Sequence, residues 1–144
     1  MICGIDVGLK GAIALLYPNG PSYVYDMPVI KKEINGAVLA EIFTEFRPDH
    51  IYLETVNSFG MGRQSAFNFG QGCGVIKGVI AALQIPFTPV SPTLWKKHFK
   101  LGRDKDESRA AATRLFPELS SEFARKKDDG RAEAILIAKW GENE

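Results

Sequence analysis

The chain has 144 residues, of which 45% are hydrophobic and 24% charged, with a formal net charge of +1. This size and composition are ordinary for one globular domain with a real core. No apolar run is long enough to cross a bilayer, and the N-terminus lacks the pattern of a secretory signal, so we expect an intracellular protein without a membrane segment. Cys3 and Cys73 are expected to be buried thiols, as is usual inside cells.

Three short strands joined by tight turns are predicted at the start of the chain. Apolar or alternating runs cover residues 2–7, 12–17 and 22–27, with glycine- or proline-containing turns after the first two. Strands connected in this way form an antiparallel meander. Helical spacing follows over residues 36–46, and a fourth strand is predicted over residues 50–54.

The second half of the chain begins with an unusual segment. Residues 57–72 contain glycine, aromatic and amide side chains with one arginine and almost no aliphatic residue, which predicts a long functional loop. The elements expected after it are helices over 73–84, from Pro92, over 104–116 and over 129–140, and a short strand over 87–90. We therefore expect one α/β domain with a mixed sheet over residues 1–144.

Acidic residues stand where burial would be costly without compensation. Asp6 ends an apolar strand, Glu54 ends the fourth strand, and Asp129 and Glu133 are four apart on the last helix. Carboxylates that share one site repel each other unless divalent cations lie between them, and Mg²⁺ and Mn²⁺ prefer oxygen ligands. The four residues are thus candidate metal ligands, and two ions could serve an in-line phosphoryl displacement.

Asp128 competes with Asp129 for the same role. A residue five positions before Glu133 points about 140° away from it on a helix, which favours Asp129. Asp128 could still contribute through a capping turn, so both remain candidates.

Five motifs along the chain belong together: Gly4-Ile5-Asp6-Val7-Gly8, Leu53-Glu54, Lys105-Asp106-Glu107-Ser108-Arg109, Leu115-Phe116-Pro117 and Asp129-Gly130-Arg131-Ala132-Glu133-Ala134. With these motifs the chain resembles a known family, the RuvC-type Holliday-junction resolvases among the ribonuclease-H-like nucleases, and their phage-encoded and chloroplast branch in particular. The resemblance runs over nearly the whole chain.

The resemblance implies a ribonuclease-H-like fold, with a mixed five-stranded sheet flanked by helices. It further implies a homodimeric endonuclease of bacterial or phage origin that uses two Mg²⁺ or Mn²⁺ ions per active site. Such an enzyme makes paired, symmetric nicks in a four-way DNA junction. Asp6, Glu54, Asp129 and Glu133 match the metal-binding acids, and Lys105 matches a lysine near the active site that would neutralise charge on the scissile phosphate.

Two regions are candidates for DNA binding. In the segment 57–72, the aromatic residues could stack on bases at an opened junction, and the polar residues could bond phosphates or base edges. These residues are Phe59, Arg63, Gln64, Phe67, Asn68 and Phe69. The alternative is that Phe67 and Phe69 begin the packed helix that follows. Basic residues that could contact phosphates on the arms are Lys96, Lys97, Lys100 and Arg103.

A second basic cluster covers residues 125–131 and lies close in sequence to the acids. Residues 72–84, a long apolar helix, could form either a dimer contact or part of the core.

Three other functions share some of these features. A sugar-kinase or actin-like ATPase needs a second phosphate hairpin, for which the chain is too short. A non-catalytic junction-binding protein would not need four acids. A nuclease acting on other branched DNA or on RNA/DNA hybrids is the nearest rival.

Overall fold

A sheet of five strands forms the middle layer of the protein. The strands are β1 (Ile2–Asp6), β2 (Ala12–Leu16), β3 (Ser22–Asp26), β6 (His50–Glu54) and β7 (Phe87–Val90). Their order is β3-β2-β1-β6-β7; β1, β2 and β3 are antiparallel, whereas β6 and β7 add in parallel to β1. The computed structural model describes residues 1–144 and confirms the predicted mixed sheet.

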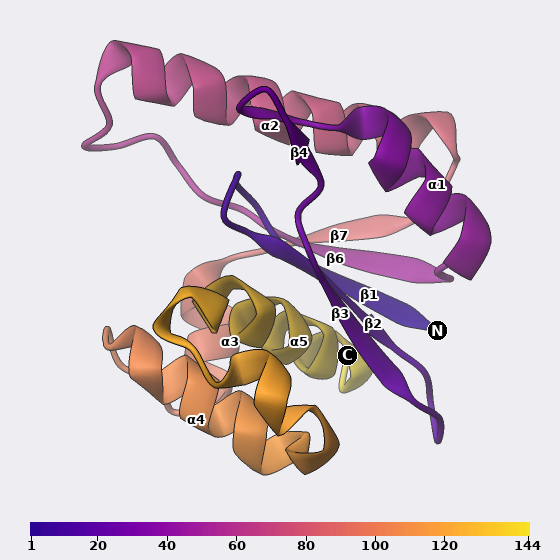
Figure 1. Ribbon diagram of the computed structural model, residues 1–144, viewed down its shortest axis with the longest axis vertical. Coiled ribbons are helices and arrows are strands. Elements are labelled where there is room, and N and C mark those ends of the chain that lie inside the picture. The colour runs from indigo at the N-terminus through magenta and orange to yellow at the C-terminus, as the bar shows by residue number, and fades with distance from the viewer.

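Helices cover both faces of this sheet (Figure 1). The helices are α1 (Gly36–Phe46), α2 (Arg63–Ala82), α3 (Pro92–His98), α4 (Lys105–Leu115) and α5 (Asp129–Glu142), with 3-10 segments η1 (Pro117–Phe123) and η2 (Lys126–Asp128) before the last. The first two lie on one face and the others on the opposite face. None of these helices combines the length and the apolar character that crossing a membrane requires.

Alternating side chains of the central strands supply both cores. In β2, Ala12 and Leu16 join the core beneath α5, whereas Ile13 and Leu15 join the core beneath α1 and α2. This period of two is the ordinary consequence of a pleated strand, and here both faces are covered. The continuous apolar run in the sequence is therefore explained by burial on both sides.

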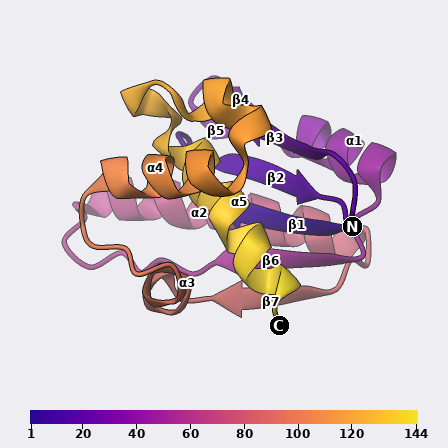
Figure 2. The ribbon, with the colours of Figure 1, turned by 90° about the horizontal axis from the view of Figure 1, so that it is seen from below.

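Helix α5 crosses the face of the sheet over β1 and β2 (Figure 2). A side chain at Gly4 would place its Cβ only 2.3 Å from the carbonyl oxygen of Ala134. At Gly130 a Cβ would lie 2.5 Å from the carbonyl oxygen of Lys10, in the β1–β2 turn. Glycine at these two positions lets α5 pack directly against β1 and against the turn that follows it.

The sequence prediction of a loop over 57–72 is wrong for most of that segment. Helix α2 begins at Arg63 and runs for 20 residues, so only the stretch before it is irregular. Glycine and aromatic residues have weak helix propensity, which favours the loop interpretation. The buried residues Ile76 and Ile80 anchor the helix on the sheet, and the helical backbone continues outward from that anchor.

A small hairpin between β3 and α1 is a further element that the sequence does not predict. Its strands are β4 (Val29–Ile30) and β5 (Glu33–Ile34), joined by Lys31 and Lys32, which both have positive φ. A two-residue turn of this kind normally carries Asn-Gly, so the lysine pair gives no turn signal in the sequence.

Candidate metal and nucleic-acid site

The site begins with two neighbouring parallel strands. β1 and β6 pair in register through Ile5 and Leu53, so the next residues, Asp6 and Glu54, stand side by side at the carboxyl ends of both strands. Asp6 is half-buried and Glu54 is buried. Ligand sites in open α/β sheets commonly lie at this end of the strands.

A third carboxylate comes from the second turn of α5. Glu133 is buried, and one carboxylate oxygen each of Asp6, Glu54 and Glu133 lies within 4.8 Å of the others. An oxygen-only donor set of this kind suits Mg²⁺ or Mn²⁺ and does not suit the soft metals. The structure thus brings together three of the four acids named as candidate ligands, and their donors fit a hard divalent cation.

Burial and mutual repulsion oppose ionisation of the three acids. The pKa of Asp6 is raised well above its usual range, first by burial and then by the charges of Glu133 and Glu54. Burial also raises the pKa of Glu54 and that of Glu133. A cation bound among them would reverse this effect, because it favours the charged form of each acid.

Trp95 is a site residue that sequence reasoning does not identify. Its indole Nε1 donates a hydrogen bond of 2.7 Å to Oε2 of Glu54, and the ring is fully buried. The bond fixes the orientation of Glu54 and opposes the rise of its pKa. The sequence signal is a tryptophan in a short helix directly after a strand adjacent to β6, but that pattern more often means a core residue.

Asp129 lies one helical turn before Glu133 and outside the close group of three. Its Oδ2 is 2.9 Å from Nζ of Lys105 at the start of α4. This hydrogen bond is the main cause that raises the pKa of Lys105. The structure thus brings together two predicted residues, Lys105 and Asp129, as an ion pair. This pair lies at the edge of the group formed by Asp6, Glu54 and Glu133, which we call the acid cluster.

Asp128, the competing candidate, is turned elsewhere. Its carboxylate accepts hydrogen bonds from the backbone N–H of Arg125 at 2.9 Å and from the guanidinium of the same residue. The side chain is only 2% exposed, and the hydrogen bonds from Arg125 lower its pKa. Asp128 therefore stabilises the turn before α5 and is not brought to the acid cluster.

Most of the predicted base-contacting residues lie at the outer end of α2. Phe59 is 90% exposed and Phe67 is 69% exposed, so the alternative that Phe67 begins a packed helix does not hold. Phe69 is half-buried, which agrees with partial packing at that position. Arg63 and Gln64 are exposed in the first turn, and Gln64 donates a hydrogen bond of 3.0 Å to Asn68.

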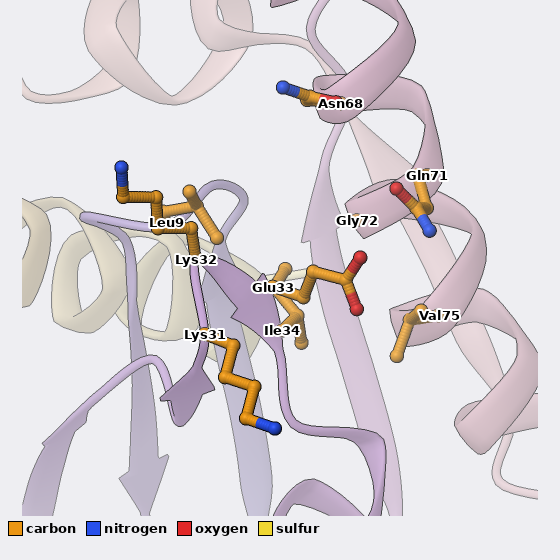
Figure 3. A pocket seen from close by; sticks show the side chains of 9 residues that line it. All are labelled: Leu9, Lys31, Lys32, Glu33, Ile34, Asn68, Gln71, Gly72 and Val75. Atoms are coloured by element: carbon orange, nitrogen blue, oxygen red, sulfur yellow. The ribbon is translucent and has the colours of Figure 1, made fainter.

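Asn68 also lines a cleft between α2 and the small hairpin. The cleft holds about 200 Å³, and Lys31, Glu33 and Gln71 stand around it (Figure 3). Gly72 forms part of the wall, where a Cβ would lie 3.0 Å from the Cδ1 atom of Ile34. The hairpin therefore supports the middle of α2 at the point where the exposed half begins.

The predicted basic residues around α3 divide into two groups. The ammonium group of Lys96 lies 5.4 Å from the centre of the Trp95 ring, and its charge counteracts the raised pKa of Glu133. Lys97, Lys100 and Arg103 are exposed. The charge of Lys96 therefore favours the ionised forms of Glu54 and Glu133, and the other three residues remain candidates for contacts with phosphates.

Comparison with known proteins places the fold. No protein-family model and no curated protein matches the sequence. The chain is similar in structure to Thermus thermophilus RuvC, solved in complex with a Holliday junction substrate, with a TM-score of 0.68, 17% identity and coverage of 96% of this chain and 90% of that chain.

Two further resolvases have the same fold. The fowlpox virus resolvase, solved with substrate Holliday junction DNA, gives a TM-score of 0.59 at 18% identity and covers 96% of both chains. The yeast mitochondrial Holliday junction resolvase Ydc2 gives 0.55 at 16% identity, covering 96% of this chain and 76% of that chain. The predicted RuvC-type, ribonuclease-H-like fold is thereby confirmed.

Proposed function

We propose that this protein is a metal-dependent endonuclease that resolves four-way DNA junctions by paired, symmetric cuts. The observation that carries the proposal is the group of three carboxylates, Asp6, Glu54 and Glu133, within 4.8 Å of one another. The group stands in a fold shared with enzymes that were solved in complex with Holliday junctions. The chemistry of these oxygen donors and the fold thus support the same activity.

The acids of this chain would hold the metal and position the phosphate. Asp6 stands among Glu54, Glu133 and the edge residue Asp129, and these four carboxylates would hold the ions. Two Mg²⁺ or Mn²⁺ ions held there would activate a water and stabilise the attacking and leaving oxygens of an in-line displacement. The products would carry 5′-phosphate and 3′-hydroxyl ends.

Lys105 is suited to the charge that develops during hydrolysis. Its side chain is 69% exposed while its ammonium group contacts Asp129 at 2.9 Å. An ammonium group in this place can neutralise negative charge on the scissile phosphate without leaving the acid cluster. Trp95 acts through Glu54, because its N–H holds that carboxylate toward Asp6 and Glu133.

The junction would be held by the exposed end of α2 and by the basic residues after α3. Phe59 and Phe67 present aromatic faces to solvent, as stacking on bases requires. Lys97, Lys100 and Arg103 would neutralise phosphates on the arms, and each such contact should add about 0.9 to the salt slope of binding.

We also propose a homodimer that forms along α2. Gly70, Gly74 and Gly78 are spaced by four on the exposed side of this helix, and a Cβ added at any of them would meet nothing within 4 Å. Each glycine costs the helix up to about 1 kcal/mol relative to alanine. No contact within one chain explains this cost, whereas the close approach of the same helix from a second copy would offset it.

The test is cleavage of an end-labelled mobile junction with Mg²⁺. Wild-type protein should give nicks paired symmetrically across the junction, and Asp6→Asn should still bind the junction but cut at least a thousandfold more slowly. Glu41→Gln, which removes an exposed acid on α1, is the matched control and should cut like wild type.

Three results would contradict the proposal. Binding in Ca²⁺ without cleavage in Mg²⁺ would indicate a junction-binding protein. Faster cutting of an RNA/DNA hybrid than of the junction would indicate the rival nuclease function. Equal cutting by Asp6→Asn would show that the acid cluster is not the active site.

A further inference from the structure

A polar groove of about 660 Å³ reaches Lys105 and Asp129 at the edge of the acid cluster. The β1–β2 turn, the first residue of α4 and the segment before α5 form its walls. Four basic side chains line it: Lys10, Lys105, Arg125 and Lys127. Of the residues assigned to the proposed hydrolysis, only Lys105 and Asp129 border this groove, so most of its lining has no role in that reaction.

Each acidic side chain in the groove already has a cationic partner. Oδ1 of Asp26 accepts a hydrogen bond of 2.7 Å from Nε of Arg131. Asp128 is held by Arg125 at 2.9 Å, and Asp129 by Lys105 at the same distance. The two remaining lysines, Lys10 and Lys127, therefore do not neutralise any of these carboxylates.

Lys10 and Lys127 are exposed, and neither forms an ion pair within the chain. The backbone of each lysine is held close to the start of α5. The carbonyl oxygen of Lys10 lies so close to Gly130 that a Cβ there would be 2.5 Å from it, and η2 holds Lys127 directly before α5. Two unpaired lysines thus line the same groove, Lys10 from the β1–β2 turn and Lys127 from the segment directly before α5.

We infer that Lys10 and Lys127 bind the phosphate of the nucleotide next to the scissile bond, and that this groove carries the cleaved strand away from the acid cluster. The inference rests on the proposed function. The ligand is a phosphodiester because the groove is polar, has unpaired positive charge, and continues from Asp129 at the edge of the proposed active site. A lysine recognises such a group as a point charge, so no base sequence is read here.

The inference is tested by pairing lysine variants with a neutral backbone linkage. A set of junctions carries one methylphosphonate in the cleaved strand, at each of the two linkages that flank the scissile one. Single-turnover cleavage is measured with wild type, Lys10→Ala and Lys127→Ala. Arg114→Ala is the control, because it removes an exposed positive charge at the far end of α4.

With the natural junction, each lysine variant should cut about tenfold more slowly than wild type, as expected for loss of one charged hydrogen bond. The Mg²⁺ concentration that gives half-maximal rate should not change, because neither lysine touches the carboxylates. One of the two neutral linkages should slow wild type by a similar factor but slow the lysine variants little further. Arg114→Ala should remain as sensitive to that linkage as wild type.

The inference is overturned if the losses from the lysine variant and from the neutral linkage multiply at both positions, because the two groups then do not interact. It is also overturned if both lysine variants cut the natural junction at the wild-type rate. Either result leaves the proposed nuclease function standing when wild type itself makes paired nicks. Absence of any cutting by wild type would instead refute the proposed function.

Discussion

The acid cluster should make the metal-free protein less stable than a variant that lacks one of its charges. Asp6→Asn keeps the size of the side chain and removes the carboxylate that lies within 4.8 Å of both Glu54 and Glu133. We expect the variant to unfold at a higher temperature than wild type in EDTA at pH 7. The same substitution should abolish cleavage, so stability and activity should change in opposite directions.

The size of the effect follows from the distance between the charges. Two unit charges within 4.8 Å of each other repel by at least about 3.5 kcal/mol at an effective dielectric constant of about 20. Partial protonation of the acids reduces this repulsion in the folded state. We therefore expect Asp6→Asn to raise the free energy of unfolding by about 2–3 kcal/mol. For a chain of this size that gain corresponds to roughly 6–12 °C in the midpoint of thermal unfolding.

The pH dependence gives the sign of the effect a second check. Because the pKa of Asp6 is raised above the ordinary value of 3.8, the folded state binds more protons than the unfolded state once the pH exceeds that value. The cluster therefore lowers the stability of wild type progressively as the pH rises above about 4. The difference between Asp6→Asn and wild type should be small at pH 4 and should grow toward pH 8.

The assay is thermal unfolding followed by circular dichroism, from pH 4 to pH 8, in EDTA and in Mg²⁺. Mg²⁺ at a hundred times its Kd should stabilise wild type by about 2.7 kcal/mol and should stabilise Asp6→Asn much less. Glu41→Gln, an exposed acid on α1, should unfold like wild type in every condition. A lower midpoint for Asp6→Asn in EDTA, or a wild-type midpoint that Mg²⁺ does not change, would refute the reasoning.

Three further predictions concern other parts of the site. Trp95→Phe removes the N–H that bonds Glu54, so Mg²⁺ affinity measured by titration calorimetry should fall about 10–100-fold; unchanged affinity would deny the orienting role. Gly74→Ala should raise the free energy of unfolding of the monomer by up to about 1 kcal/mol, because alanine favours the helix more than glycine does. Gly74→Leu should dissociate the dimer, as measured by sedimentation velocity; a dimer that persists with leucine would show that the interface lies elsewhere. Phe67→Ala should leave Mg²⁺ binding intact and reduce junction cleavage or its sequence preference, since the ring is 69% exposed; unchanged cleavage and preference would assign the ring no contact with DNA.

The strands that carry the acids are predictable because their signals are local. A continuous apolar run ending in Asp6 and a second ending in Glu54 identify two buried strands, and their parallel pairing brings the two ends together. The placement of Asp129 and Glu133 on one helix face follows from helical spacing alone. The sequence is sufficient to predict where these four acids lie, because the strand or helix that carries each acid sets its position.

The start of α2 is not predictable in the same way. Its first half has glycine and aromatic residues, little aliphatic content and few buried side chains, so neither periodicity nor propensity identifies a helix there. The helix depends on an anchor further along, at Ile76 and Ile80, and on the hairpin that meets Gly72. Tertiary contacts of this kind override local propensity, and the sequence shows only the propensity.

The choice between Asp128 and Asp129 depends on the direction of the chain at a single turn. The sequence shows two adjacent aspartates before a helix, and only the contact with Arg125 shows which carboxylate is already neutralised. Asp128 is thus paired with Arg125, and Asp129 forms its ion pair with Lys105. The charge of Lys105 also opposes the raised pKa values of Asp6 and Glu133.

The charges of Lys96 and Lys105 compensate the remaining three acids only in part. The indole of Trp95 donates a hydrogen bond to Glu54, and burial still raises the pKa of all three carboxyl groups. A core arranged for stability alone would not gather three carboxylates in this way. A bound cation is therefore the best physical reason for the arrangement, and the response of wild type to Mg²⁺ is the measurement on which the whole assignment depends.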